Sequence, residues 1–284
     1  LALLAAAEQA PDAPQIASAE LICHIEDLKT DTQANVLLDA SRKEIIVAFR
    51  GSTNLNDAVY DAMILQSSVT IGGKDVAVHT GFWKQYASVK HAIFEVVQNL
   101  QVQTKGHATV VFVGHSLGGA LAQIAALDFA GSTVAALGSV PAAAAPRPSV
   151  ACYTLGTPRV GDARFARAHD AAIPDSFRIV NSEDIVTRLP GCILNYCHAG
   201  KSVLCDKKDG SMWVEGESKG DCPLRSLIRT WKDELLHEWQ FWRSLVCFNG
   251  IQEHFDVSYF EALKMVVVNV LEELDPVVEE KAAA

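Results

Sequence analysis

The pentapeptide Gly-His-Ser-Leu-Gly at residues 114–118 decides the fold of this 284-residue chain. It lies between two apolar runs, 108–113 and 120–129. The first run is β-branched and aromatic, which is typical of a buried parallel strand. The second is rich in Ala and contains no Pro or Gly, which favours a buried helix. The sequence therefore predicts a sharp strand–turn–helix unit that presents the hydroxyl of Ser116, with a chance loop as the alternative interpretation.

A serine hydroxyl at this position needs two partners, because it is unreactive at neutral pH without a base and a carboxylate that orients the base. In enzymes built on such a turn, the acid and then the histidine follow the serine along the chain. Asp184 is the best acid, since it follows the strand-like segment 177–181 and functional groups gather where parallel strands end. Glu183 is its nearest rival, and an ordinary turn residue is the alternative interpretation of Asp184.

Three histidines follow Asp184 and are candidates for the base: His198, His237 and His254. His237 lies within a helical pattern between Leu and Trp residues, which indicates packing. His254 lies in a loop-like stretch before a final predicted helix at 257–273. We therefore predict that His254 is the base.

Four further blocks accompany the pentapeptide in a fixed order: IIVAFRGS at 45–52, VHTGF at 78–82, YTLGTPRVGD at 153–162 and NSEDIVTRLP at 181–190. With these blocks, the chain resembles the class 3 fungal-type triacylglycerol lipases and their feruloyl esterase and diacylglycerol lipase relatives. The resemblance extends from about residue 23 to residue 260. It implies an α/β-hydrolase fold, with a central, mostly parallel sheet flanked by helices.

The resemblance also implies roles for individual residues. The acid of the family falls on Asp184, and the oxyanion hole falls on the backbone N–H groups of Ser52 and Leu117. Some members place the catalytic histidine five residues before a tyrosine, which His254 and Tyr259 match, whereas others place it at the position occupied here by Asp256. A second set is expected to be structural: His79, His115, His198, Arg50 and Arg159.

Many relatives carry a short lid helix with an exposed Trp after the oxyanion loop, where this chain has residues 53–63. Leu55, Val59 and Met63 share one face of a predicted helix there and are the candidate lid and substrate contacts. The face is small, contains no Trp and is flanked by Asp residues. This pattern predicts a preference for partial glycerides or shorter acyl esters, and an ordinary surface helix is the alternative.

Composition predicts one domain over 1–284, with a cysteine-rich and helical insertion at about 192–252. A hydrophobic content of 49% is enough for a large core. The net charge of −10 argues against nucleic-acid partners, and no apolar run is long enough for a transmembrane helix. Residues 1–7 are either the end of a secretory signal or a short helix.

Seven cysteines occur, of which Cys152 lies in a predicted strand and is expected to be a buried thiol. The other six are predicted to form disulfides, with Cys23 paired to Cys247 and the remaining four paired among themselves: Cys192, Cys197, Cys205 and Cys222. Metal binding is the alternative, but no paired C-x-x-C spacing occurs, so no metal is predicted. Disulfides predict a secreted, extracellular protein.

The expected strands cover 44–49, 109–114, 150–155 and 177–181. The expected helices cover 83–104, 117–130, 162–171, 224–247 and 257–273, and residues 1–40 are expected to form a helical layer broken by Pro11 and Pro14. Together these features predict a serine esterase that hydrolyses acylglycerol-type esters through an acyl-enzyme and needs no cofactor. Three alternatives remain: a feruloyl-type esterase, a phospholipase A1 and a non-catalytic lipase-like binding protein.

Overall fold

The computed structural model describes residues 19–51, 65–137, 149–181, 184–191, 194–206, 212–214, 254, 258–261 and 263–264. The chain divides into two compact units. The first runs to Arg178 and includes Val186–Gly200, and the second comprises Ile179–Ile185 and the chain from Lys201 onward. The single domain predicted over 1–284 stays a prediction.

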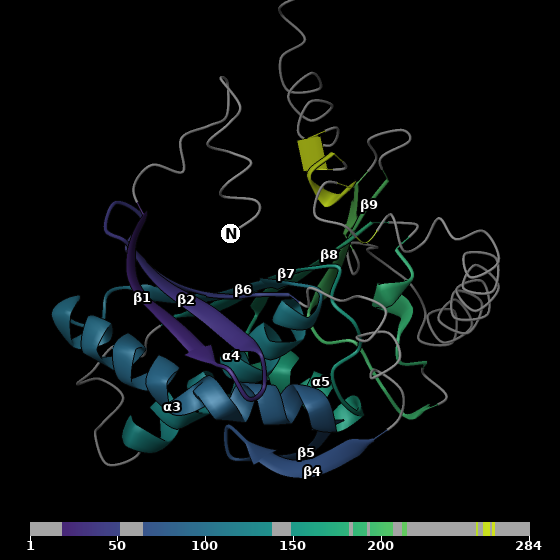
Figure 1. Cartoon of the computed structure of the whole chain (residues 1–284), viewed down its shortest axis with the longest axis horizontal. Helices are drawn as coiled ribbons and strands as arrows, with labels where there is room; N and C mark the ends of the chain where they lie inside the picture. The colour runs from purple at the N-terminus through teal and green to yellow at the C-terminus, as the bar shows by residue number, and fades with distance from the viewer. Residues whose placement is uncertain are drawn as a thin grey trace, which may run out of the picture. The chain divides into compact units, whose positions relative to one another are not determined.

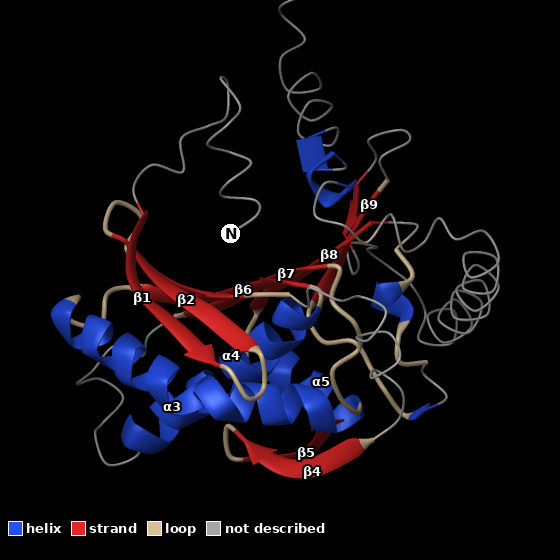
Figure 2. Ribbon diagram, viewed as in Figure 1, coloured by secondary structure: helices blue, strands red, loops and turns tan. Residues whose placement is uncertain are grey.

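The first unit is built on a sheet that is parallel at its centre (Figures 1 and 2). Its strand order is β1-β2-β3-β6-β7-β8, from β1 (Ala19–Asp27), β2 (Thr32–Asp39), β3 (Glu44–Phe49), β6 (Thr109–His115), β7 (Val150–Leu155) and β8 (Asp175–Asn181). β6 pairs in parallel with both β3 and β7. The four strands predicted at 44–49, 109–114, 150–155 and 177–181 are therefore confirmed.

The N-terminal layer is a β-hairpin, so the predicted helical layer is wrong over residues 19–39. β1 pairs with β2 and β2 pairs with β3, both antiparallel. In β2 the side chains of Thr32, Ala34 and Val36 are buried while the residues between them are half-buried. This alternation is the mark of a strand, and the free edge of β3 provides its pairing partner. Pro11 and Pro14 lie outside the described residues.

Three helices lie on one face of this sheet: α3 (Thr80–Gln103), α4 (Leu117–Leu137) and α5 (Ala163–Ala172), of which α5 packs against α4 (Figure 1). They confirm the helices predicted at 83–104, 117–130 and 162–171. A second, unpredicted hairpin of β4 (Gln66–Ile71) and β5 (Lys74–His79) packs against the helices. It is drawn below them in Figure 1.

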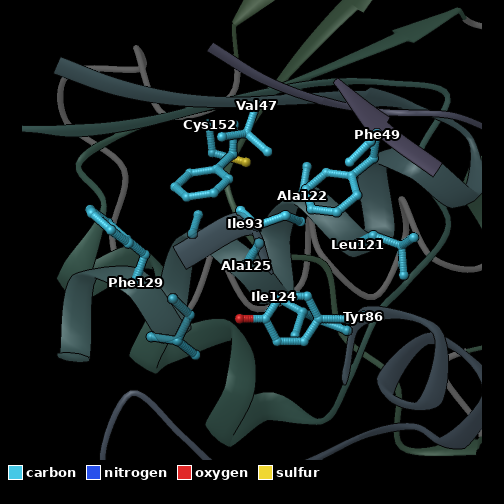
Figure 3. Close-up of a cluster of buried hydrophobic side chains, with 14 of the residues drawn as sticks. Val47, Phe49, Tyr86, Ile93, Leu121, Ala122, Ile124, Ala125, Phe129 and Cys152 are labelled. Atoms are coloured by element: carbon cyan, nitrogen blue, oxygen red, sulfur yellow. The ribbon is translucent and has the colours of Figure 1, made fainter. Parts of the chain in front are cut away.

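The core of the first unit lies between the sheet and α3 and α4 (Figure 3). Phe129 of α4 contacts both Phe94 and Phe112, with ring centroids 5.4 and 5.9 Å away. Full burial of a phenylalanine ring, as for Phe112 and Phe129, stabilises the fold by roughly 1.5–3 kcal/mol. Cys152 is fully buried in this core, which raises the pKa of its thiol to about 12. The prediction of a buried thiol at Cys152 is therefore confirmed.

The other cysteines correct the predicted disulfides. Cys23 lies on β1 as a free thiol, so the predicted Cys23–Cys247 bridge is wrong. Cys205 is also a buried free thiol, so the predicted pairing of all four cysteines in 192–222 is wrong as well. The number of cysteines in the sequence does not indicate which of them form disulfides. Cys192, Cys222 and Cys247 lie outside the described residues.

The second unit contains the end of β8, followed by β9 (Lys201–Cys205) and β10 (Met212–Val214), which pair antiparallel. Residues 258–261 and 263–264 are helical, within the helix predicted at 257–273. The helix predicted at 224–247 and most of the insertion predicted at 192–252 lie outside the described residues. Across the part of the chain that is described, no helix combines the length and apolar character needed to cross a membrane.

Candidate active site

Ser116 lies on the turn between β6 and α4, as predicted. We call residues 114–118 the nucleophile elbow. Ser116 has φ 56°, in the left-handed region that non-glycine residues seldom adopt, and it is 3% exposed. Its N–H donates to the carbonyl of Leu155 at 2.9 Å, and its own carbonyl accepts from the N–H of Gly119 at 3.0 Å. These bonds hold the serine backbone at the junction of strand and helix, in the kind of strained conformation that often marks a functional residue.

Two glycines allow the elbow to turn so sharply. A Cβ atom at Gly118 would overlap the carbonyl oxygen of Phe49 on β3 and lie 2.9 Å from the carbonyl carbon of Arg50. A Cβ atom at Gly114 would overlap the backbone of Gly118 and lie 2.5 Å from the nitrogen of Gly119. All these neighbours are backbone atoms, which cannot rotate away. The spacing of the two glycines therefore follows from the contact between β6, β3 and the first turn of α4.

Replacing Gly114 with alanine is expected to destabilise the protein by roughly 1–3 kcal/mol, the usual cost of an overpacked site. Activity should fall with it, because the backbone on either side of Ser116 must shift. Thermal unfolding and ester hydrolysis measure the two effects. Gly191→Ala is the matched control, since a Cβ atom there has no neighbour within 4 Å. Equal unfolding temperatures for the two variants would contradict this explanation of the motif.

The helix that follows the elbow begins at Leu117. The first N–H groups of a helix have no acceptor within the helix and carry partial positive charge, so the N–H of Leu117 is available to an oxyanion formed beside Ser116. The second predicted donor, Ser52, lies outside the described residues, as do the candidate lid residues Leu55, Val59 and Met63. Their roles stay predictions.

The predicted acid and base meet in the second unit. Asp184 follows β8, and its N–H donates to the carbonyl of Asn181 at 3.1 Å. Its Oδ2 lies 2.8 Å from Nδ1 of His254, although 70 positions separate the two residues in the chain. Both side chains are fully buried. The histidine and the carboxylate predicted from the sequence, His254 and Asp184, therefore form a hydrogen-bonded pair.

The chemistry of this pair determines which ring nitrogen of His254 carries the proton. An ionised carboxylate only accepts hydrogen bonds, so Nδ1 of His254 must be the donor to Asp184. In the neutral ring, Nε2 then carries the lone pair, which is the site that accepts a proton. This is the tautomer that a general base needs, and the carboxylate stabilises the imidazolium that forms when the base is protonated.

Tyr259 contacts Asp184, a contact that the spacing between Tyr259 and His254 in the sequence did not predict. The hydroxyl of Tyr259 donates to the same Oδ2 atom of Asp184 at 2.5 Å. Tyr259 is fully buried in a helical turn, residues 258–261. The only signal in the sequence was its fixed distance from His254, which does not identify a hydrogen-bond partner.

The block at 153–162 includes Arg159, which forms hydrogen bonds with the loop at 188–190. The guanidinium of Arg159 donates to the carbonyls of Arg188 and Pro190, and its N–H donates to the carbonyl of Leu189 at 2.7 Å. Arg159 thus holds the loop that follows Val186, which confirms its predicted structural role. Arg50 is likewise a structural donor, because its guanidinium lies 2.6 Å from the carboxylate of Asp31.

Asp162 closes the same block as the N-cap of α5, accepting from the N–H of Phe165 at 2.9 Å. Burial acts to raise the pKa of its carboxyl. Hydrogen bonds from Phe165, Arg164 and Ala77 outweigh burial, so the pKa is lowered. The carboxylate therefore stays ionised and holds the start of α5 against β5.

The predicted structural role of His79 is confirmed by its position as the N-cap of α3, where Nδ1 accepts from the N–H of Phe82 at 3.4 Å. His115 ends β6 and lies within the elbow, directly before Ser116. The rivals to the acid and base, Glu183 and His237, lie outside the described residues.

A family model for class 3 lipases matches residues 46–194, which include the elbow, the 153–162 block and Asp184. The chain belongs to the class 3 lipase family. This match confirms the resemblance that the five sequence blocks predicted.

Two fungal lipases are among the relatives with similar sequences. The secreted mono- and diacylglycerol lipase A of Penicillium cyclopium is 30% identical over 169 residues, which are 60% of this chain and 50% of the relative. A lipase of Rhizopus niveus is 30% identical over 244 residues, or 85% of this chain and 54% of the relative. The chain thus spans about half the length of these lipases.

Solved lipase structures share the fold. The complex of Rhizomucor miehei lipase with its propeptide superposes with a TM-score of 0.61 at 30% identity, covering 72% of this chain and 63% of that one. A triacylglycerol lipase whose catalytic centre is a serine protease triad gives a TM-score of 0.61 at 29% identity, covering 72% and 74%. Together with the parallel strands at the centre of the sheet, these similarities confirm the predicted α/β-hydrolase fold.

Proposed function

We propose that this class 3 lipase relative is a serine esterase that hydrolyses acylglycerol-type esters. The observation that carries the proposal is the buried hydrogen bond between Asp184 and His254, in a chain that also holds Ser116 in the left-handed turn of a nucleophile elbow. An oriented acid–base pair and a serine on a strained turn are the parts that acyl transfer requires. The proposal treats both units as parts of one hydrolase domain.

In the proposed mechanism, Nε2 of His254 takes the proton of the Ser116 hydroxyl as its oxygen attacks the ester carbonyl. The N–H groups of Leu117 and Ser52 stabilise the negative charge that develops on the carbonyl oxygen. The imidazolium then gives its proton to the departing alcohol, leaving an acyl group on Ser116. Water, activated by the same imidazole, attacks the acyl-enzyme, and the acid departs as Ser116 regains its proton.

We further propose partial glycerides or shorter acyl esters as the preferred substrates. The small apolar face predicted for Leu55, Val59 and Met63 supports a modest lid. Several relatives are named as mono- and diacylglycerol lipases, which agrees with this preference. Three of the relatives are also named as secreted, and on this ground we propose an extracellular location. Finding the native protein in the culture medium rather than in washed cells would support that location.

Two experiments test the proposed function. A fluorophosphonate probe should label the wild-type protein and leave Ser116→Ala unlabelled, because the probe reacts only with an activated serine. Failure of the wild-type protein to react would favour the alternative of a non-catalytic binding protein. The family match and the buried Asp184–His254 pair both argue against that alternative.

The second experiment compares monoacyl-, diacyl- and triacylglycerols of one chain length, below and above their solubility limits. We expect the partial glycerides to be hydrolysed faster, with activity already present on monomeric substrate. A steep rise in rate at the solubility limit of the triacylglycerol, with little activity below it, would contradict this preference. Methyl ferulate and phosphatidylcholine complete the panel, because they test the feruloyl esterase and phospholipase A1 alternatives directly.

A further inference from the structure

Asp184 receives two hydrogen bonds on one oxygen atom. Oδ2 accepts from Nδ1 of His254 at 2.8 Å and from the hydroxyl of Tyr259 at 2.5 Å. All three residues are fully buried, so water does not compete for these bonds. A hydrogen bond to a charged group is stronger than one between neutral groups, and a dry surrounding strengthens it further.

The hydroxyl of Tyr259 is itself held in place. The N–H of Asn181 donates to it at 3.1 Å, so its oxygen accepts from the backbone at the end of β8 while its proton is directed at Asp184. Asn181 also accepts from the N–H of Asp184 at 3.1 Å. These bonds link both the backbone and the carboxylate of the acid to Asn181 of β8.

We propose that Tyr259 is a positioning residue for the base: its hydroxyl fixes the carboxylate of Asp184 so that Oδ2 meets Nδ1 of His254. This inference rests on the proposed function. Without the hydroxyl, Oδ2 of Asp184 loses one of its donors, so the carboxylate holds the imidazole of His254 less firmly in one orientation. Tyr259 touches neither substrate nor Ser116 in this scheme, and it acts only through Asp184.

Tyr259→Phe tests the proposal, since it removes the hydroxyl and keeps the ring. We expect kcat on a soluble p-nitrophenyl ester to fall about tenfold, which corresponds to about 1.4 kcal/mol of lost transition-state stabilisation, with KM unchanged. An unchanged kcat in folded Tyr259→Phe would overturn the proposal.

A double-mutant cycle with Asp184→Asn separates positioning from packing. If Tyr259 acts through the carboxylate, Tyr259→Phe should cause no further loss of kcat in the Asp184→Asn background, because the group that it positions is already gone. A packing role predicts the same tenfold loss in both backgrounds. Equal losses would therefore overturn the proposal while leaving the role of Asp184 intact.

Tyr86→Phe is the matched control. Tyr86 is also fully buried, and its hydroxyl donates to a carboxylate oxygen of Asp128 at 2.8 Å, within the core of α3 and α4 (Figure 3). Loss of this hydroxyl is expected to lower the unfolding temperature without changing kcat. Should both variants lower kcat alike, the effect of Tyr259→Phe would be one of general stability, and the proposal would fail.

Incorporation of 4-aminophenylalanine at position 259 keeps the inference testable if Tyr259→Phe does not fold. Its amino group retains a weaker N–H donor and nearly the same volume, so kcat should fall less than tenfold at unchanged KM. A loss of kcat of tenfold or more in this folded variant, despite the retained donor, would count against the proposal. Fluorophosphonate labelling of the wild-type protein is measured in parallel. If the wild-type protein is not labelled, the proposed function has failed, whereas labelled wild-type protein with an unaffected Tyr259→Phe variant refutes this inference alone.

Discussion

Ser116→Ala is expected to lower ester hydrolysis by about 10⁶-fold, because the three members of a catalytic triad act as a unit. The variant retains the elbow, with both glycines and the start of α4, but has no oxygen to attack the ester. Alanine is smaller than serine, so the buried site has room for it. The measurement is the initial rate on p-nitrophenyl butyrate, with a detection limit set by heat-inactivated enzyme.

The control for Ser116→Ala is its folding, measured by circular dichroism and thermal unfolding. Ser116 is strained in the left-handed region and alanine shares that strain, so the unfolding temperature should stay close to that of the wild type. If the purified variant retained even a tenth of the activity, the nucleophile would have to be sought outside the elbow.

His254→Ala is expected to be nearly as severe, since Ser116 keeps its proton at neutral pH when no base is present. The variant also leaves the buried carboxylate of Asp184 with one donor fewer, so some loss of stability should accompany the loss of activity. Added imidazole can enter the vacated space and act as the base, so it should restore part of the hydrolysis. The same imidazole should have no effect on Ser116→Ala.

Two other histidines serve as controls for His254→Ala. His91 lies exposed on α3, and His91→Ala should leave both activity and unfolding unchanged. His237 is the rival candidate from the sequence, and His237→Ala is expected to affect mainly stability. An active His254→Ala beside an inactive but folded His237→Ala would show that the wrong histidine has been assigned.

The elbow was predictable from the sequence because its structure is set by neighbours in the chain. The left-handed turn at Ser116, the glycines on either side and the helix start at Leu117 all lie within residues 114–118. Asp184 was predictable for a similar reason, since it follows β8 by only three residues. Spacing to Tyr259 then selected His254 from three histidines, and the bond to Asp184 agrees with that choice.

Where the predictions failed, the structure depends on partners that are distant in the chain. The segment 19–39 is apolar enough for either a helix or strands. It forms a hairpin because β2 pairs with the edge of β3. Similarly, Cys23 was assigned a disulfide by counting, yet it lies on β1 as a free thiol. The residues next to a strand or a cysteine in the sequence do not determine which strand or which cysteine it pairs with.

The sequence by itself determined the family and the fold, because both depend on short motifs whose residues adopt one local geometry, whereas the candidate triad stays a prediction. Tertiary structure alone decided that the hydroxyl of Tyr259 and the imidazole of His254 share one oxygen of Asp184. Those contacts join residues 75 and 70 positions apart. A hydrogen bond requires atoms within about 3 Å at a suitable angle. Only the packing of the helical turn at 258–261 against the end of β8 brings these atoms together, and no local pattern in the sequence records it.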